Sequence, residues 1–371
     1  MKKKIWMMLL CGALVCFPLG GCGINRADAD TGSVHSEAAS DHKTTKNSNA
    51  EYTSEVFAMD TYMTLTAYGE NAKEAVEAGI AEIQRLDALL STGDANSEVA
   101  QINQNGGGTL SEDTDYLVKR ALAIYQSTQG AFDISIYPVM QLWGFTTGDF
   151  AVPSKEDLAA KLALVNAGRI SLTEDNGVSS ITLPEGMEID LGGIAKGYTS
   201  GKVMEVMKRY GIESAVINLG GNAHVLGSKS DGSAWKVGIQ DPNDTKGYLG
   251  GVSVRDKAII TSGGYERYFV DEATGVKYHH IIDPKTGYSA NNGLISVTIV
   301  SADSTLADGL STSLFVLGTE DAIAYCEEHC AEDGFDAIME DEDGKLYITD
   351  GIMDDFINMN NTANIQEIKT K

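Results

Sequence analysis

Three glycine-rich segments carry the residues best suited to phosphate chemistry. Each follows a predicted strand and places two adjacent glycines where the strand ends, in residues 190–198, 217–222 and 261–265. Backbone N–H groups freed at such junctions bind phosphate oxygens, above all at the positive end of a following helix, and Lys196 would add a charge. Neither a Walker loop nor a G-x-G-x-x-G fingerprint is present, and a single glycine turn is usually structural. Three junctions in one chain predict a shared phosphate-binding mouth.

A carboxylate and two hydroxyls share one side of a helix predicted over residues 304–317. At about 100° per residue, Asp308, Ser311 and Thr312 converge there, whereas the leucines of the segment form the opposite side. Further apolar residues fall outside the leucine stripe, so the helix is predicted to be enclosed and its Asp308 to need a partner. That partner is an arginine, a backbone N–H, or Mg²⁺, a hard ion held by one or two carboxylates together with substrate phosphates.

Two adjacent histidines precede a predicted turn in residues 278–287. Strand alternation places His280 and Ile282 on one face and His279 on the other, and the Pro and Gly that follow suit a turn. Either histidine is a structural hydrogen-bonding residue or, beside a nucleophile, a general base.

The first 22 residues predict a lipoprotein signal. Three lysines precede an apolar run over residues 5–19, which is shorter than the roughly 20 residues of a membrane-spanning helix. The run ends in Leu19-Gly20-Gly21-Cys22, which resembles the bacterial lipobox, where the cysteine thiol receives a diacylglycerol. An uncleaved anchor or a chance cysteine is the alternative. We expect a signal peptide over residues 1–21, lipidation of Cys22, and an extracytoplasmic protein anchored to the outer face of the cell membrane.

The segment after Cys22 is predicted to be a tether. Residues 23–51 contain no Phe, Tyr or Trp, so they cannot bury enough apolar surface to offset the entropy lost on ordering. A coil of this length spans roughly 30 Å r.m.s.. We therefore expect a lipidated, disordered tether over residues 22–51 and one folded domain over residues 52–365.

Composition argues against nucleic-acid binding. The 53 acidic and 28 basic residues give a formal charge of -25, which becomes -28 once residues 1–21, with three lysines and no other charge, are removed. Such a field repels phosphate backbones and anionic lipid, so membrane attachment must come from the lipid anchor. The 40 glycines among 371 residues point to tight turns and close backbone approaches.

Two cysteines, Cys326 and Cys330, lie outside the first 22 residues. They are four apart in a predicted helix, with His329 between them. A lone pair is a weak signal for a metal site, so we favour buried or idle thiols, and no disulfide framework is implied.

The order of the helix and strand patterns predicts the fold that positions these residues. Strands joined by hairpin turns are grouped late in the chain, so we expect an α+β fold with a largely antiparallel sheet flanked by helices. Predicted helices begin at Ser111 and Ser154, two capping residues, and also cover residues 71–90 and 194–210. The first is expected to close at Gly130, and the second to carry Leu158, Leu162 and Val165 on one face. Strand-like stretches occupy residues 52–68, 214–219, 235–239, 257–261 and 294–300.

Together these segments resemble the ApbE-type FAD:protein FMN transferases, in one order from about Phe57 to Gly318. The matching motifs are Met59-Asp60-Thr61, Ala131-Phe132-Asp133, Leu142-Trp143-Gly144-Phe145, residues 190–198, residues 218–222, Thr261-Ser262-Gly263, residues 280–284 with Thr286-Gly287, and Ala307-Asp308 with Thr312. The resemblance implies an ApbE-like fold and a Mg²⁺-dependent enzyme. Such an enzyme cuts the pyrophosphate of FAD, joins FMN by a phosphoester to a Thr or Ser of an acceptor flavoprotein, and releases AMP.

The resemblance also implies a role for individual residues. His280 would be the base that takes a proton from the acceptor hydroxyl. The Asp308, Ser311 and Thr312 side chains and the Gly193 carbonyl would hold Mg²⁺. FAD would be lined by Met59, Ala131, Phe132, Asp133, Asp190, Lys196 and Ile282. The acceptor would present a short Asp-containing segment that ends in Thr or Ser.

Two departures from the family pattern leave alternatives open. An aromatic residue often follows the Ser-Thr pair matched by Ser91-Thr92, but this chain has Gly93, and some relatives carry an aspartate where it has Ser311. The first departure keeps open an FAD pyrophosphatase that yields FMN and AMP. A flavin-binding lipoprotein without chemistry is the third hypothesis.

Overall fold

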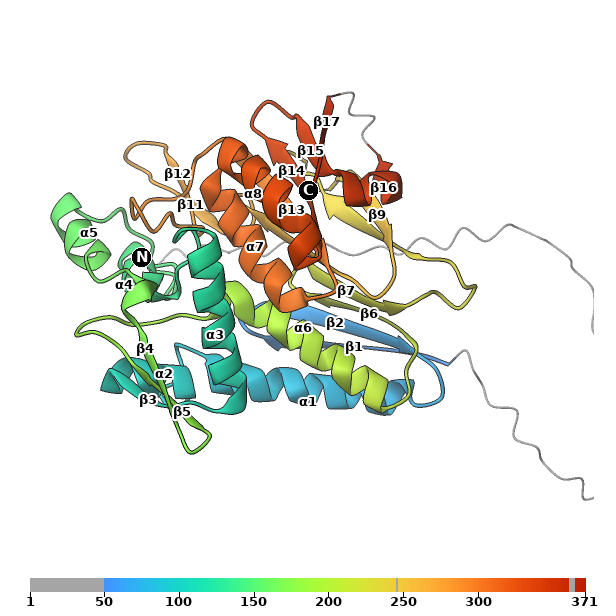
Figure 1. The fold of residues 1–371 in the computed structure, drawn as a ribbon, viewed down its shortest axis with the longest axis horizontal. Helices are drawn as coiled ribbons and strands as arrows, with labels where there is room; N and C mark the ends of the chain where they lie inside the picture. Colours follow the sequence, from blue (N-terminus) through green and yellow to red (C-terminus); the bar gives the residue numbers. More distant parts are fainter. Residues whose placement is uncertain (1–49, 245, 360–363) are drawn as a thin grey trace, which may run out of the picture.

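A nine-stranded sheet runs through the centre of the structure, a computed structural model that describes residues 50–244, 246–359 and 364–371 (Figure 1). Neighbouring strands are antiparallel except the last pair, which is parallel, so the predicted α+β class is confirmed. The predicted signal, Cys22 and the tether up to residue 49 lie outside the described residues. The strand order is β1 (Glu51–Ala58), β2 (Thr61–Tyr68), β6 (Ser214–Leu219), β7 (Asn222–Gly227), β10 (Ala258–Gly263), β13 (Leu294–Ser301), β14 (Phe335–Asp341), β15 (Leu346–Thr349), β17 (Ile365–Ile368).

Four helices cover one face of this sheet: α1 (Ala72–Leu90), α6 (Gly192–Arg209), α7 (Ser304–Leu317) and α8 (Thr319–Asp333) (Figure 1). The opposite face packs on a three-stranded sheet of β16 (Phe356–Asn358), β9 (Tyr248–Val254) and β8 (Trp235–Gln240). Alternation along the strands divides the core, since Ile260 of β10 faces the helices and its neighbour Ile259 faces the second sheet. Within the described residues, no helix has the length and apolar character to cross a membrane.

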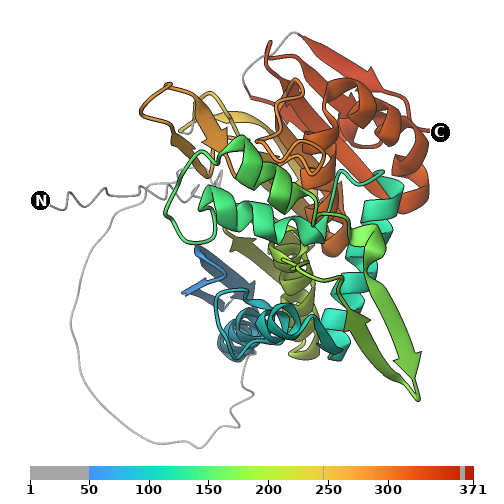
Figure 2. The ribbon, with the colours of Figure 1, turned by 90° about the vertical axis from the view of Figure 1, so that its left-hand side faces the viewer.

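The remaining elements surround the helical layer. α3 (Glu112–Ser127) crosses α6 and α7, and α2 (Glu98–Asn105) lies beside a three-stranded sheet of β3 (Gly107–Thr109), β5 (Val178–Thr182) and β4 (Ser171–Asp175). A hairpin of β11 (Tyr268–Val270) and β12 (Lys277–His279) projects from another side, next to α4 (Tyr137–Trp143) and α5 (Lys155–Leu162) (Figure 2). Three 3₁₀ turns complete the set: Ile134–Ile136, Ala167–Arg169 and Asp350–Asp355.

The first strand-like stretch, residues 52–68, is a hairpin. β1 and β2 are joined by a two-residue turn in which Met59 and Asp60 have φ of 48° and 59°. Two positive φ values suit the twist of a two-residue hairpin, although Gly or Asn is the usual occupant. Asp87 of α1 holds this turn, because its Oδ1 accepts the N–H of Met59 across 3.1 Å. The turn therefore has a fixed shape.

Helices α6 and α7 touch through backbone at Gly197. A Cβ at this position would lie 2.2 Å from the carbonyl oxygen of Ser304 and 2.6 Å from Cβ of Asp308, so only glycine allows this approach. The Ser304 hydroxyl donates to the Gly197 carbonyl across 2.7 Å. α6 begins at Gly192, two residues before the predicted start, so the paired glycines form its first turn rather than a preceding loop.

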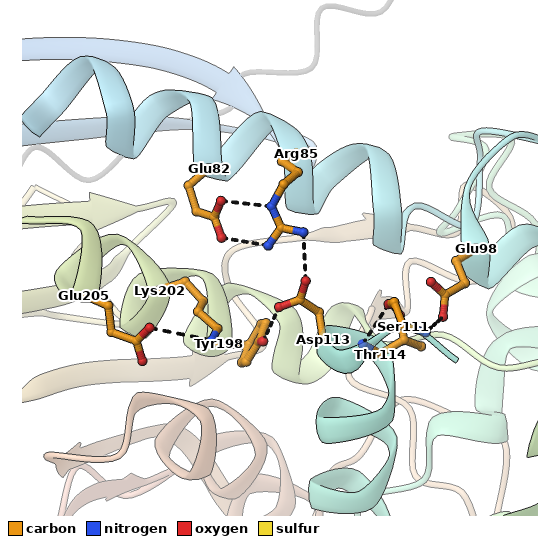
Figure 3. Close-up of polar contacts among 9 residues, drawn as sticks. All are labelled: Glu82, Arg85, Glu98, Ser111, Asp113, Thr114, Tyr198, Lys202 and Glu205. Carbon is orange, nitrogen blue, oxygen red and sulfur yellow. Dashed lines mark hydrogen bonds and ion pairs between the residues drawn. The ribbon is translucent and has the colours of Figure 1, made fainter. Parts of the chain in front are cut away.

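A polar cluster fixes α6 against α1 and α3 (Figure 3). Arg85 of α1 contacts both Glu82, at 2.7 Å, and Asp113 of α3, at 2.7 Å, and the Tyr198 hydroxyl of α6 donates to the same Asp113. Burial raises the pKa of Asp113, but the hydrogen bonds from Arg85 and Tyr198 outweigh it and hold the pKa below its usual value. Tyr198 follows Gly197 directly, so this cluster sets the position of the α6 turn that meets α7.

Candidate active site

Asp308 lies where α7 crosses the first turns of α6. It is 5% exposed, and its Oδ2 accepts the N–H of Gly197 across 2.7 Å while Oδ1 accepts the side-chain N–H of Asn222 across 3.1 Å. The predicted partner is thus a backbone N–H, and no Lys or Arg of the described chain forms an ion pair with it. Burial raises its pKa. A buried carboxylate with only neutral contacts is a suitable ligand for a cation.

The Gly193 carbonyl belongs to the helical turn that precedes Gly197. In a regular α-helix the N–H of Gly197 binds the carbonyl four residues earlier, which is that of Gly193. Here this N–H donates to Asp308. The carboxylate therefore competes with the Gly193 carbonyl for one donor, which makes the carbonyl available to another group.

Two further oxygens come from α7 itself. Ser311 and Thr312 both face β10, where the Ser262 hydroxyl lies 2.9 Å from the Ser311 hydroxyl and 3.3 Å from that of Thr312. The Ser311 hydroxyl donates to the Asp308 carbonyl across 2.9 Å. The structure therefore places the Ser311 and Thr312 hydroxyls together with Ser262, which the sequence marked only as part of a glycine-rich junction, and Ser311 reaches Asp308 through its backbone carbonyl.

This donor set fits a small hard cation. Among the described residues, no group of three or more His, Cys, Asp or Glu is arranged to hold a metal. The oxygens present are one carboxylate, several hydroxyls and a carbonyl, and Mg²⁺ uses such ligands when substrate phosphates supply the rest. Ser311 contributes no charge, so Asp308 is the single anionic ligand of the set.

Lys196, in the first glycine-rich segment, acts on carboxylates of several elements. Its charge stabilises the anionic forms of Asp190 in the same segment, of Glu266 after the third segment, and of Asp308 on α7. The second segment joins them through Asn222, which donates to Asp308. Asp190 accepts the N–H of Gly192 on Oδ1 across 2.8 Å, and burial raises its pKa. The predicted convergence of these segments is thus present, with Lys196 among them. Phosphate binding there stays a prediction.

His280 follows β12 and faces Arg267 at the base of β11. The His280 N–H donates to the Arg267 carbonyl across 3.0 Å, and Nδ1 lies 3.2 Å from the same oxygen. Because a carbonyl only accepts, Nδ1 carries the proton and Nε2 is left as a free base. Burial, then the charges of Arg267 and Lys196, lower the pKa of His280 to about 3. The imidazole is therefore neutral at physiological pH.

His279 lies on the opposite face and has a structural role. Its Nε2 is 2.9 Å from the Ala290 carbonyl, and its ring packs edge-on against Phe315. The alternation predicted for the two histidines is present. Ile282, on the face of His280, is buried in a cluster around Trp143.

Glu266 is a candidate that the sequence analysis missed. It directly follows the third glycine-rich segment, residues 261–265, and a Cβ on Gly221 would lie 3.6 Å from its carboxylate. Burial raises its pKa to about 7, with Lys196 opposing the shift. The side chain nevertheless keeps exposed area, as do Asp190 and His280. Solvent therefore reaches all three groups, and the charge of Lys196 acts on each of them, so we call the region that they share around Lys196 the recess.

Several of the residues implied to line FAD lie beside α6 or directly before it. Met59 occupies the β1–β2 turn, with its sulfur 3.8 Å from the Thr199 hydroxyl of α6. Phe132 touches Gly193, since a Cβ there would lie 3.0 Å from the Phe132 ring. The N–H of Asp190 donates to the Ile134 carbonyl across 2.8 Å, which fixes residues 131–134 beside the start of α6.

Asp133 uses its side chain within the fold. It is 7% exposed, its Oδ1 accepts both the N–H and the hydroxyl of Ser135, and its Oδ2 accepts the N–H of Ala167. Burial raises its pKa. Both carboxylate oxygens are therefore used within the fold, and Asp133 would contact a ligand through its backbone.

A cavity of about 620 Å³ opens beside this loop, with Ala131, Asp283, Lys285 and Asn292 in its lining. Its volume is in the range of small-molecule sites. A second cavity of about 930 Å³ runs along α3 and the later turns of α6, and none of the predicted FAD or metal residues lines it.

Two other predictions concern residues away from the recess. Gly93 is exposed, and a Cβ there would meet only the Ser91 hydroxyl, at 3.8 Å, so the place of the family's aromatic side chain is open space. Cys326 and Cys330 are buried thiols in α8, as predicted.

Comparison with known proteins places this geometry among flavin-transferring enzymes. The family model described as the ApbE family matches residues 59–339. A protein of Klebsiella pneumoniae named FAD:protein FMN transferase is 37% identical over 246 residues, which is 65% of this chain and 75% of that protein. One of the same name from Treponema pallidum is 33% identical over 325 residues, covering 82% of this chain and 88% of the relative.

Solved structures of ApbE proteins are also similar to this chain. The crystal structure of the ApbE protein of Thermotoga maritima superposes with a TM-score of 0.75 at 31% identity, covering 81% of this chain and 98% of that one. The flavin transferase ApbE of Vibrio cholerae superposes with a TM-score of 0.70 at 30% identity, covering 81% and 97%.

Proposed function

This chain belongs to the ApbE family, and from that premise we propose that it transfers the FMN moiety of FAD to a Thr or Ser hydroxyl of an acceptor flavoprotein and releases AMP. The relatives named FAD:protein FMN transferase support an enzyme with FAD as substrate and a protein as acceptor. The observation that carries the proposal is the recess itself. The charge of Lys196 acts there on a buried carboxylate, Asp308, and on a neutral His280.

Each of these residues has a task in the proposed reaction. Lys196 and the N–H groups at the glycine junctions bind the pyrophosphate oxygens. His280 holds a proton on Nδ1 and takes the acceptor's hydroxyl proton on Nε2. The hydroxyl oxygen then forms a bond to the FMN phosphorus, and the bond from that phosphorus to the bridging oxygen breaks, so AMP leaves with the electron pair.

Asp308, Thr312, Ser311 and the Gly193 carbonyl would hold Mg²⁺. When bound, the ion neutralises charge on the phosphate oxygens. The Asp308 carboxylate is already oriented before the ion binds, because the N–H of Gly197 and the amide of Asn222 each hold one of its oxygens.

Two alternatives remain distinguishable. Open space at Gly93 favours entry of water and hence hydrolysis of FAD to FMN and AMP. A flavin-binding lipoprotein without chemistry is disfavoured by the free Nε2 of His280.

One experiment separates the three functions. Purified protein is incubated with FAD, Mg²⁺ and a flavin-accepting domain from the host of one of the relatives, and acceptor mass and free AMP are measured. Transfer gives an adduct of FMN mass and an equal amount of AMP. AMP without adduct indicates hydrolysis, and absence of both leaves binding alone.

We further propose that the enzyme works outside the cytoplasm, tethered by lipid on Cys22 to the outer face of the cell membrane. The sequence of residues 1–22 supports this. Metabolic labelling with a fatty acid tests it, since Cys22→Ser should abolish the label and release the protein from membranes. Equal labelling of Cys22→Ser would contradict lipidation at this residue.

A further inference from the structure

Strand β11 presents an unpaired backbone edge next to His280. Its partner β12 pairs in the register Tyr268↔His279, Phe269↔Tyr278 and Val270↔Lys277. The flanking bonds, from His280 N–H to the Arg267 carbonyl and from Asp271 N–H to the Val276 carbonyl, show which residues face β12.

Alternation in an antiparallel pair then turns the N–H and C=O groups of Tyr268 and Val270 away from β12. In the described part of the chain, no strand pairs with that side of β11.

The side chains on this edge are apolar and open to solvent. Tyr268 is 47% exposed and Val270 is 51% exposed. Phe269 between them points to the other face, where it stacks on Phe150 with ring centres 5.2 Å apart. The hairpin is thus anchored through one face and projects from the body of the molecule (Figure 2). An exposed apolar strand edge is a template for another strand unless something covers it.

The register connects this edge to the candidate base. Arg267 lies opposite His280, and residues directly opposite in a sheet point to the same face. A strand added along β11 would therefore place the residue in register with Arg267 on the face of His280. The two Cα atoms would be two strand spacings apart, roughly 9.6 Å. Nδ1 of His280 lies 3.2 Å from the Arg267 carbonyl oxygen. The imidazole ring therefore extends from its own strand towards β11 and spans part of the distance between the two Cα atoms.

Two cations flank the edge. Arg267 and Lys277 form no ion pair with any carboxylate of the described residues, and Nζ of Lys277 lies 4.1 Å from the centre of the Tyr268 ring. The Arg267 guanidinium also donates to the Phe145 carbonyl, so it is held in place but not neutralised. In a chain with a formal charge of -25, cations without a carboxylate partner are unusual, and they are attachment points for a partner's carboxylate. The edge therefore combines hydrogen-bonding groups, apolar side chains and complementary charge for an acidic, extended segment.

We propose that β11 is the docking strand for the acceptor protein, whose extended segment adds to it as a third strand and presents its hydroxyl residue in register with Arg267. This inference rests on the proposed transferase function and names how its protein substrate is held. β11 has three residues, so the backbone bonds are few and the Tyr268 and Val270 side chains share the recognition.

Hydrogen exchange tests the edge without chemistry. The full chain is mixed with a flavin-accepting domain whose hydroxyl residue is replaced by Ala, and exchange is followed at single residues. The amides of Tyr268 and Val270 should slow at least roughly tenfold, because each becomes hydrogen-bonded. Unchanged exchange at both amides in a complex that forms would overturn the proposal.

Val270→Pro tests the same edge in turnover. It removes an outward N–H that β12 does not use, and proline is tolerated on such edges. We expect the KM for the acceptor domain to rise about tenfold, with FAD binding and AMP release without acceptor unchanged. Val270→Ala, which keeps the N–H, is the matched control and should change KM less. Equal KM values for Val270→Pro and wild type would contradict docking on β11.

The two failures are distinguishable. If the wild type forms no adduct at all, the proposed transferase function fails, whereas the exchange experiment still reports whether the edge binds the acceptor. If adduct forms but neither amide is protected, the function stands and the docking strand is wrong.

Discussion

Gly197 donates its N–H to Asp308 across 2.7 Å at the point where two helices meet through backbone. The donor belongs to α6 and the acceptor to α7, 111 positions apart in the chain. The same glycine accepts a hydrogen bond from Ser304, one turn before Asp308. The place of the carboxylate is therefore set by the helix contact itself.

Gly197→Ala should disturb this contact. The new Cβ would lie 2.2 Å from the Ser304 carbonyl oxygen, so the helices must move apart, at a cost of about 1–3 kcal/mol in the free energy of unfolding. Thermal unfolding measures the loss. Gly201→Ala is the control, because its Cβ would meet only the Ser304 hydroxyl, at 3.0 Å, and should cost less. Equal stability of Gly197→Ala and wild type would mean that the helices are not held at this distance.

Asp308→Asn should remove the response to Mg²⁺. It keeps the shape and an oxygen for Gly197 but removes the one anionic ligand of the predicted set. We expect AMP release to fall about 100-fold or more, and the rise in melting temperature that Mg²⁺ gives the wild type to disappear. Ser311→Asp, which restores a second carboxylate, should bind Mg²⁺ more tightly. Full activity of Asp308→Ala in the presence of a chelator would remove the metal from the mechanism.

His280→Ala should slow transfer by roughly 10²–10⁴ with little effect on FAD binding. A pKa of about 3 keeps the imidazole neutral, so protonation of His280 should not reduce the rate between pH 7.5 and 5.5. The sign follows from the lowered pKa, because the base form is lost only when pH falls towards that value. A rate that falls with a midpoint near 6.5, and only when His280 is present, would contradict this environment.

Glu266→Gln should remove a different pH dependence. With a pKa of about 7, this carboxyl is neutral below that pH and anionic above it, where it repels a diphosphate. FAD affinity, followed by flavin fluorescence, should therefore weaken as pH rises through about 7. In Glu266→Gln the affinity should stay flat over this range. A wild-type affinity independent of pH would place the FAD phosphates away from Glu266.

Gly93→Tyr should shift the balance between water and acceptor. The position is exposed and has no positive φ, and a Cβ meets nothing closer than 3.8 Å, so the fold accepts the side chain. If the aromatic ring covers the flavin and excludes water, AMP formed without acceptor should fall while adduct formation is kept or raised. Gly93→Ala controls for the loss of backbone freedom. Unchanged hydrolysis in Gly93→Tyr would show that this position does not control water.

Much of the fold follows from local sequence signals. Helix α7 has the predicted bounds because its leucine stripe is uninterrupted, and Ser111 and Ser154 cap their helices through the hydroxyl as predicted. Strand β6 also has the predicted bounds. The ApbE-family assignment is confirmed because many short motifs occur in one order.

The differences arise where tertiary contacts override local preference. α6 starts two residues early because Phe132 and Asp190 support glycines that alone would favour a turn. α3 and α5 end before Gly130 and Val165, and no glycine or asparagine marks the turn at Met59. The last strand also continues past residue 365, to Ile368.

The site residues show the same division. Asp308, Ser311 and Thr312 could be grouped from helical periodicity alone. Asn222 and Glu266 could not, because each reaches the recess through strand pairing and a hairpin whose geometry the sequence does not state. The burial that shifts the pKa of His280 likewise depends on distant segments.

The helix contact at Gly197 has a consequence for the order of folding. The residues implied to line the flavin come mostly from the first two hundred positions, but Asp308 lies 111 residues after Gly197. In the proposed enzyme, the nucleotide site therefore lacks its acidic ligand until the final third of the chain has folded onto the rest. A chain truncated before α7 would not form the proposed metal site.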